Sequence, residues 1–238
     1  MLLRALVWQH RSCYFTGSIV ASRLSYTPGM PSRGGTNREI EIKLRVTDAS
    51  ALLGKLRRLR AASRGRVFER NTLYDTPDSA LRRAGCILRL RSESPAPPAR
   101  SRASGKGTPF PGGHPRAILA MKAPVLAPSQ RYKERLECER VITKGHAWPA
   151  ILRSLGFHAV FRYEKYRTAL RLLGLEVDLD ETPIGIFLEL EGAPSKIDRV
   201  ARMLGYAPRD YICATYGELY AAHCRRRGRF PRDMVFAA

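Results

Sequence analysis

Charged residues recur at every second position in several segments whose other residues are apolar. The pattern occupies residues 39–43, 89–91, 135–139, 165–167, 176–180 and 189–191. Side chains two positions apart in a β-strand point to the same side, so each segment would place its charges on one face and its apolar residues on the other. Several strands of this kind predict a sheet wrapped around a polar interior.

The whole chain predicts an α+β fold. About eight or nine segments have strand character and about four or five have helical periodicity. Residues 157–163 and 165–173 are expected to be separate strands, and helices are expected near 194–204 and 210–222, with Asp210 as the N-cap of the second. A sheet with so many strands and few intervening helices is expected to be mainly antiparallel.

Paired acidic residues predict a metal site in the polar interior. Glu39 and Glu41 share one strand face, and the same spacing recurs in Glu189 and Glu191 and within residues 176–180. Neighbouring carboxylates repel one another, so a cation would stabilise them, and oxygen ligands alone suit Mg²⁺ or Mn²⁺ rather than zinc. The alternative is an amphipathic strand whose charged face lies in solvent.

Basic residues follow the same spacing. Arg89 and Arg91 share a face, as do Lys165 and Arg167, and Lys122 lies in a short apolar strand. Guanidinium groups bind phosphate oxygens in bidentate fashion, and an ammonium group binds them as a point charge. The interior is therefore predicted to bind a phosphate compound. The alternative, in which these cations only neutralise the neighbouring acids, stays open.

The net charge also favours an anionic partner. The chain has 42 Lys and Arg against 21 Asp and Glu, a formal net charge of +21. This excess favours a nucleotide, a polyphosphate or a nucleic acid, although codon usage in a GC-rich genome would also enrich arginine. The five cysteines have no C-x-x-C spacing, which argues against a zinc site and for a cytoplasmic location. No apolar run reaches the roughly 18 residues of a membrane span, so no membrane association is expected.

Three segments are expected to lie outside the packed domain. Residues 1–37 are interpreted as a basic leader that is either disordered or the product of a mis-assigned start, because the first 38 residues contain no Asp or Glu. A true start at Met30 is the favoured interpretation, and organellar targeting by residues 1–29 is the less favoured one. The Pro-, Gly- and Ser-rich stretch near residues 94–115 predicts a flexible insert. The arginine-rich tail, residues 223–238, is expected to be frayed.

A series of short blocks resembles the CYTH superfamily, the triphosphate tunnel metalloenzymes. The first block is E-I-E-I-K at residues 39–43, which is a weak pattern alone. The later blocks are L-Y-D-T-P at 73–77, L-R-L-R at 88–91, Lys122, R-L-E-C-E at 135–139, Lys165 with Arg167, V-D-L-D at 177–180, and G-I-F-L-E-L-E-G at 185–192. Their common order makes the resemblance specific.

The resemblance implies an eight-stranded antiparallel β-tunnel, a closed barrel with a polar lining and flanking helices, over residues 38–222. It implies metal ligands at Glu39, Glu41, Glu137, Glu139, Glu189 and Glu191. It implies that Lys43, Arg89, Arg91, Lys122, Lys165 and Arg167 bind the triphosphate. Lys43, Asp178 and Asp180 would take part in catalysis.

The implied activity is that of a metal-dependent enzyme, using Mg²⁺ or Mn²⁺, on inorganic triphosphate, ATP or a similar compound. Hydrolysis is favoured. A class IV-type adenylyl cyclase that forms cyclic AMP and pyrophosphate is the alternative, because Thr215 stands where thiamine triphosphatases have a lysine and its segment resembles the bacterial cyclase-like branch. A non-catalytic binder of polyphosphate or RNA is a third reading, in which nucleic acid is disfavoured by the sparse aromatic residues. A homodimer is left open.

Overall fold

The computed structural model describes residues 37–96 and 115–237, which lie within one compact unit, Gly34–Ala238. Almost all of the predicted leader and most of the predicted insert lie outside the described residues. The strands are β1 (Asn37–Val46), β2 (Ala62–Asp75), β3 (Ile87–Pro95), β4 (Arg116–Pro124), β5 (Lys133–Ile142), β6 (His158–Leu172), β7 (Leu175–Thr182) and β8 (Gly185–Glu191). The helices are α1 (Ala49–Arg58), α2 (Ala80–Arg83), α3 (Trp148–Ser154), α4 (Pro194–Leu204) and α5 (Tyr216–Arg226), with 3₁₀ turns at Gly145–Ala147 and Pro208–Asp210.

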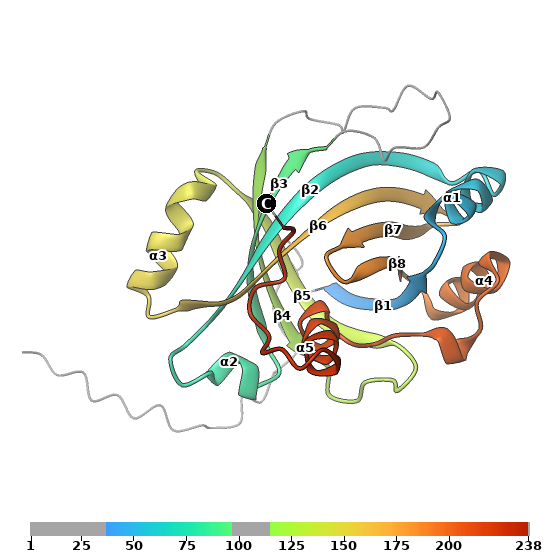
Figure 1. Cartoon of the computed structure of the whole chain (residues 1–238). Helices are drawn as coiled ribbons and strands as arrows, with labels where there is room; N and C mark the ends of the chain where they lie inside the picture. The colour runs from blue at the N-terminus through green and yellow to red at the C-terminus, as the bar shows by residue number, and fades with distance from the viewer. Residues whose placement is uncertain (1–36, 97–114, 238) are drawn as a thin grey trace, which may run out of the picture. The chain divides into compact units, whose positions relative to one another are not determined.

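The eight strands form one closed antiparallel barrel with flanking helices, so the predicted fold class is confirmed (Figure 1). The order around the barrel is β1-β5-β4-β3-β2-β6-β7-β8, and β8 pairs with β1 to close it. Across this last pair, Lys43 lies opposite Glu189 and Glu41 lies opposite Glu191. The period of two along each strand therefore places a row of charges on the inner wall.

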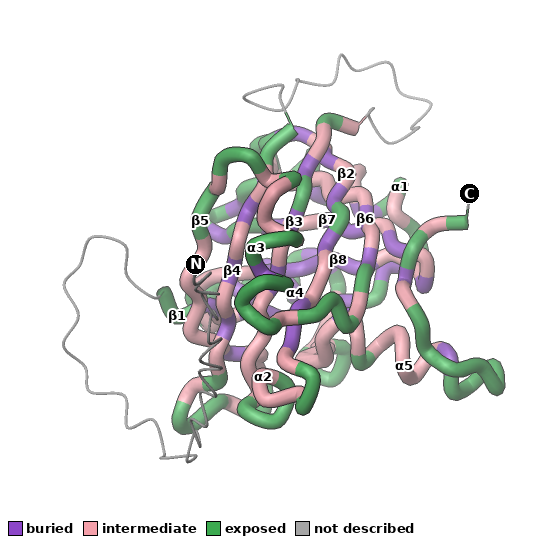
Figure 2. Tube along the Cα trace, turned by 90° about the vertical axis from the view of Figure 1, so that its left-hand side faces the viewer, coloured by how far each residue is buried: buried purple, intermediate pink, exposed green. Residues whose placement is uncertain are grey.

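Strand β1 is buried on both of its faces. Its apolar Ile42 and Leu44 are fully buried on the outer face, and Lys43 between them is only 2% exposed. Helices α1 and α4 cover the outer face, where Leu56 and Ile197 join the same hydrophobic core. Buried residues accordingly follow the strands, while the connecting segments are mostly exposed (Figure 2). The alternative of a strand with its charged face in solvent is therefore wrong for β1.

Local capping explains where the helices begin. The Asp48 side chain accepts a hydrogen bond from the backbone N–H of Ala51 (2.9 Å) and caps α1. The last helix begins later than expected, since Asp210 lies in a 3₁₀ turn and Thr215 caps α5 in a reciprocal capping box with Glu218. In the described part of the chain, no helix combines the length and apolarity needed to cross a bilayer.

Strand β6 and the C-terminal residues differ from expectation. Strand β6 is one continuous strand of 15 residues, so the predicted break near residue 164 is wrong. Residues 230–237, here called the strap, lie along it: the Met234 carbonyl accepts from the Glu164 N–H, and its N–H donates to the Arg162 carbonyl, both at 2.9 Å. Met234 is 1% exposed and packs with Tyr163 and Tyr216. The prediction of a frayed tail is therefore wrong for the strap, because Met234 is buried against β6 and α5.

Candidate active site

The barrel encloses a cavity of about 430 Å³ whose wall is largely charged. The predicted metal-binding and triphosphate-binding residues all line it: Glu39, Glu41, Lys43, Arg89, Arg91, Lys122, Glu137, Glu139, Lys165, Arg167, Glu189 and Glu191. They come from β1, β3, β4, β5, β6 and β8. Asp178 and Asp180, which were predicted to be catalytic, are not among the lining residues. The inner wall thus brings acids and bases from most of the barrel into one space.

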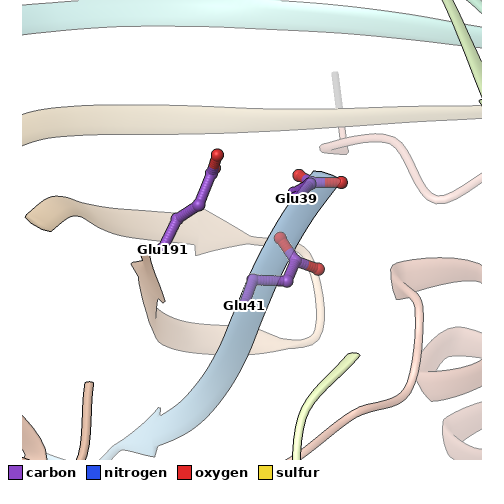
Figure 3. A group of neighbouring side chains, drawn as sticks. All are labelled: Glu39, Glu41 and Glu191. Atoms are coloured by element: carbon purple, nitrogen blue, oxygen red, sulfur yellow. The ribbon is translucent and has the colours of Figure 1, made fainter. Parts of the chain in front are cut away.

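Three glutamates meet closely at the β1–β8 wall. Glu39, Glu41 and Glu191 each offer a carboxylate oxygen within 4.8 Å of the others (Figure 3). Burial, together with the charges of Glu39 and Glu41, raises the pKa of Glu191 to about 8. Burial and the charge of Glu41 likewise raise the pKa of Glu39. A cation would relieve this repulsion, and an oxygen-only donor set fits a hard divalent ion such as Mg²⁺ or Mn²⁺.

Like Glu39 and Glu41 of this trio, the other acids predicted as metal ligands contact basic side chains. The pairs are Glu137–Lys122 (3.1 Å), Glu139–Arg89 (3.1 Å) and Glu189–Lys43 (3.2 Å). These acids therefore balance the cations of the cavity, which is the role that the salt-bridge alternative gave them. Their assignment as metal ligands stays a prediction.

Lys43 lies at the centre of the β1–β8 wall. Its Nζ is 2.8 Å from Glu41 and 3.2 Å from Glu189. Burial lowers the pKa of Lys43, but the charges of Glu189 and Glu41 outweigh it and hold the pKa above its ordinary value. An ammonium group held in its charged form can bind an anion and stabilise developing negative charge, but it has no lone pair with which to act as a general base.

Asp180 lies behind the cavity wall and is fully buried. It accepts hydrogen bonds from Lys165 (2.7 Å), from Arg167 (2.8 and 2.7 Å) and from the Tyr216 hydroxyl (2.7 Å). Asp178 lies 2.7 Å from Arg167, and burial raises the pKa of Asp178 to about 7. Both aspartates are thus placed to orient the basic residues, and the predicted catalytic role remains a prediction.

Sequence reasoning missed two charged residues of this network. Lys133 lines the cavity, with its Nζ 2.5 Å from Glu41. Glu69 is completely buried and lies 3.6 Å from each of Arg91 and Arg167. Both could have been found by extending the period of two, since Lys133 continues the row at residues 135–139 and Glu69 precedes Asn71 by two positions.

The aromatic ring of Tyr216 was also missed. It lies 5.3 Å from the Lys43 ammonium and 5.1 Å from that of Lys165, within the range of a cation–π contact. Tyr216 is the first residue of α5 and lines the cavity. The strand pattern gives no signal for it, because it reaches the barrel from a helix.

Comparisons with known proteins agree with this architecture. A model of the CYTH domain matches residues 37–206, which include all eight strands and α4. A candidate adenylate cyclase from Vibrio parahaemolyticus is 19% identical with a TM-score of 0.61, covering 79% of this chain and 98% of that one. A Pyrococcus horikoshii protein is 22% identical with a TM-score of 0.60, covering 78% and 99%.

A candidate adenylate cyclase from Bacillus halodurans is 16% identical with a TM-score of 0.52, covering 78% of this chain and 98% of that one. At these identities the likeness shows the fold alone. No curated protein matches the chain. The domain match covers well over half of the sequence and the barrel carries the expected charged wall, so this chain belongs to the CYTH domain family.

Proposed function

We propose that this protein is a divalent-metal-dependent enzyme that hydrolyses the triphosphate group of inorganic or organic compounds. One observation carries the proposal: a trio of carboxylates lies beside a row of buried cations inside a single cavity of the barrel. A triphosphate is long, flexible and highly charged, so it needs both a divalent ion and several fixed cations along its length. We assign this activity to residues 38–222.

Glu39, Glu41 and Glu191 would hold Mg²⁺ or Mn²⁺. When bound, the ion would offset phosphate charge and polarise a phosphoryl oxygen. The remaining phosphate oxygens would be bound by the basic residues that line the cavity: Lys43, Arg89, Arg91, Lys122, Lys165 and Arg167. These cations are already fixed in place by buried partners, so little reorganisation is needed when charge develops in the transition state.

Adenylyl cyclase activity is the second candidate. The residues that line the barrel cavity do not distinguish cyclase activity from hydrolysis, because both reactions bind the triphosphate through the same metal ion and cations. A specific observation favours keeping it: a second cavity adjoins the tunnel at Leu73, Ile87, Thr215 and Gly217 and offers room for an organic group. A ribose hydroxyl rather than water would then be the nucleophile, and pyrophosphate the leaving group.

Product analysis of the purified protein tests the proposal. Inorganic triphosphate and ATP would each be incubated with Mg²⁺, with Mn²⁺ and with EDTA. Hydrolysis releases phosphate or pyrophosphate in the metal-containing reactions, whereas cyclase activity releases cyclic AMP with pyrophosphate. Absence of every product in all metal-containing reactions would refute an enzyme of this class and would favour a non-catalytic polyphosphate binder.

The setting is also a proposal. Cys86, Cys138, Cys213 and Cys224 are free thiols in the described residues, which fits a reducing compartment such as the cytoplasm.

A further inference from the structure

Tyr163 continues the inward-facing row of strand β6. It lies two positions before Lys165 and four before Arg167, and all three side chains line the barrel cavity. The period of two along the strand places them on one face. Tyr163 is 7% exposed, so its phenol is almost fully enclosed by the barrel. The basic row of β6 therefore ends in a neutral hydroxyl rather than in a third cation.

The ring of Tyr163 is held in place by its neighbours. It stacks on the ring of Phe161, with centroids 5.8 Å apart at 24°, and lies 6.0 Å from the ring of Tyr216. Met234 of the strap packs against it, and the strap pairs with β6 at this residue. A side chain that is already fixed loses little further freedom when a ligand binds, so the Tyr163 hydroxyl is preorganised.

The Tyr163 hydroxyl differs from the other hydroxyls that line the barrel cavity. That of Tyr216 donates to Asp180 (2.7 Å), and that of Thr215 donates within the capping box of α5 (2.8 Å). The Tyr163 oxygen instead interacts with the Arg89 guanidinium, which has no lone pair and can only donate. In the described part of the chain, the phenolic proton of Tyr163 therefore has no acceptor.

Arg89 also has a donor without a partner. Its Nε is buried and makes no hydrogen bond to any described residue, although its Nη2 donates to Glu139 (3.1 Å). A buried N–H group that lacks an acceptor is costly, so an anion beside it would be stabilising. The Arg89 Nε and the Tyr163 proton are thus two unsatisfied donors on side chains that meet inside the barrel cavity.

Positive charges surround the Tyr163 hydroxyl. Burial raises the pKa of Tyr163, but the charges of Arg89, Lys165 and Arg91 outweigh it and hold the pKa below its ordinary value of 10. The side chains that pack against it from the other elements are uncharged: Asn71 on β2, Tyr216 on α5 and Met234 on the strap. This part of the cavity is therefore suited to an anion.

We propose that the Tyr163 hydroxyl contacts the substrate directly, by donating a hydrogen bond to a phosphate oxygen that Arg89 also binds. The inference rests on the proposed function, because it requires the barrel cavity to take a triphosphate group. The phenol adds a neutral donor to a set of cations, so it binds phosphate without a charge that an acid of the cavity must balance. Its contribution depends on its proton, because a phenolate has no hydrogen to donate and repels phosphate.

Tyr163→Phe tests the contact, because it removes the hydroxyl and keeps the ring with its packing. Tyr166→Phe is the matched control: Tyr166 lies on the same strand, lines neither cavity, and packs against Phe68 and Phe236. The affinity of the full chain for inorganic triphosphate with Mg²⁺ would be measured by titration calorimetry at pH 7 and at pH 9.5. Thermal unfolding without ligand would show that each variant is folded.

Tyr163→Phe is expected to bind triphosphate roughly tenfold more weakly than wild type at pH 7, through the loss of one hydrogen bond to a charged acceptor. The gap between the two proteins should narrow at pH 9.5, because the wild-type phenol has then lost part of its proton. Lys165 and Tyr216 keep theirs, since both have a raised pKa, and they are present in both proteins. Tyr166→Phe should match wild type at both pH values.

A measurement on the wild type does not depend on any variant. At pH 9.5, triphosphate binding should lower the near-ultraviolet absorbance of phenolate, because Tyr163 must regain its proton in order to donate it. The inference is overturned if this absorbance does not change, if a folded Tyr163→Phe variant keeps wild-type affinity at pH 7, or if Tyr166→Phe loses as much affinity. A gap of equal size at the two pH values would also overturn it.

The two proposals fail in different ways. Weakened triphosphate binding by Tyr163→Phe, in a protein that hydrolyses neither inorganic triphosphate nor ATP, would refute the proposed hydrolysis and leave the contact standing. Metal-dependent hydrolysis by the wild type, together with unchanged triphosphate affinity in Tyr163→Phe, would do the reverse.

Discussion

Lys122 donates hydrogen bonds to both carboxylate oxygens of Glu39, at 2.8 and 2.7 Å, although their strands are not neighbours. Strand β5 lies between β4 and β1 in the barrel. The two side chains meet because the closed sheet curves and turns them toward a common interior. Barrel closure therefore places a predicted phosphate-binding cation directly beside a predicted metal ligand.

Glu39→Gln should separate metal binding from folding. The substitution keeps the shape of the side chain and removes one charge of the trio, so we expect the thermal stabilisation by Mg²⁺ to disappear and turnover to fall by roughly 100-fold or more. Mg²⁺ titrations followed by thermal unfolding and by phosphate release would measure both effects. Glu176→Gln is the control, since Glu176 is exposed. Near-normal turnover of Glu39→Gln at saturating Mg²⁺ would contradict the metal assignment.

Glu191→Gln should stabilise the metal-free protein at high pH. The pKa of Glu191 is raised to about 8 in the folded protein from an ordinary value of 4.5. Its protonated form therefore favours folding fully below pH 4.5, and that contribution is lost as the pH rises through 8. In EDTA, the variant should unfold at a higher temperature than wild type at pH 9 and at a similar temperature at pH 4.5. A difference that is equal at the two pH values would contradict the raised pKa.

Arg89→Ala and Arg91→Ala should have different effects. Arg89 contacts Glu137 and Glu139, which have some exposure, so its removal should weaken triphosphate binding more than it lowers stability. Arg91 contacts Glu69, which is completely buried. Removal of the Arg91 guanidinium takes one positive charge away from the buried Glu69 carboxylate and should lower the free energy of unfolding by about 3 kcal/mol.

Urea denaturation and triphosphate titration would measure the two effects of these arginine substitutions. The double variant Arg91→Met with Glu69→Gln should recover part of the lost stability, because no buried charge is then left unpaired. If the double variant is less stable than Arg91→Ala, the cost at this position does not arise from Glu69.

Met234→Ala, a substitution in the C-terminal strap, should destabilise the fold. Met234 is 1% exposed, and its truncation leaves a cavity beside Tyr163, at an expected cost of about 2–5 kcal/mol. Val235→Ala is the matched control, because Val235 is the next residue of the strap and is 43% exposed. Equal unfolding midpoints for the two variants would show that the strap is not anchored through Met234.

The barrel and its lining could be predicted because the information is local. A period of two along a strand states which side chains share a face, and Glu39, Glu41 and Lys43 do line the cavity. By contrast, the spacing within one strand does not show which acids of different strands lie close together. Glu191 joins Glu39 and Glu41 only because β8 pairs with β1. Glu137 lines the same cavity from β5 and is not part of that group.

The burial of the strap also could not be predicted from local sequence. An arginine run followed by a few apolar residues has no pattern of its own, and Met234 is buried only because β6 offers it a surface. Tyr216 is similar, since its contact with Asp180 depends on where α5 meets the barrel. Contacts that join distant segments in this way cannot be derived from the spacing of residues within one segment.

The ion pairs of the cavity link its two expected ligands thermodynamically. Glu39 and Glu41 now hold Lys122, Lys43 and Lys133. When these carboxylates turn to a divalent ion, the lysines lose part of their counter-charge and become available to phosphate oxygens. Thermodynamic linkage then requires that the metal and the triphosphate each raise the affinity for the other by the same factor. The barrel should consequently bind the divalent ion and the triphosphate cooperatively, and it should bind either one weakly in the absence of the other.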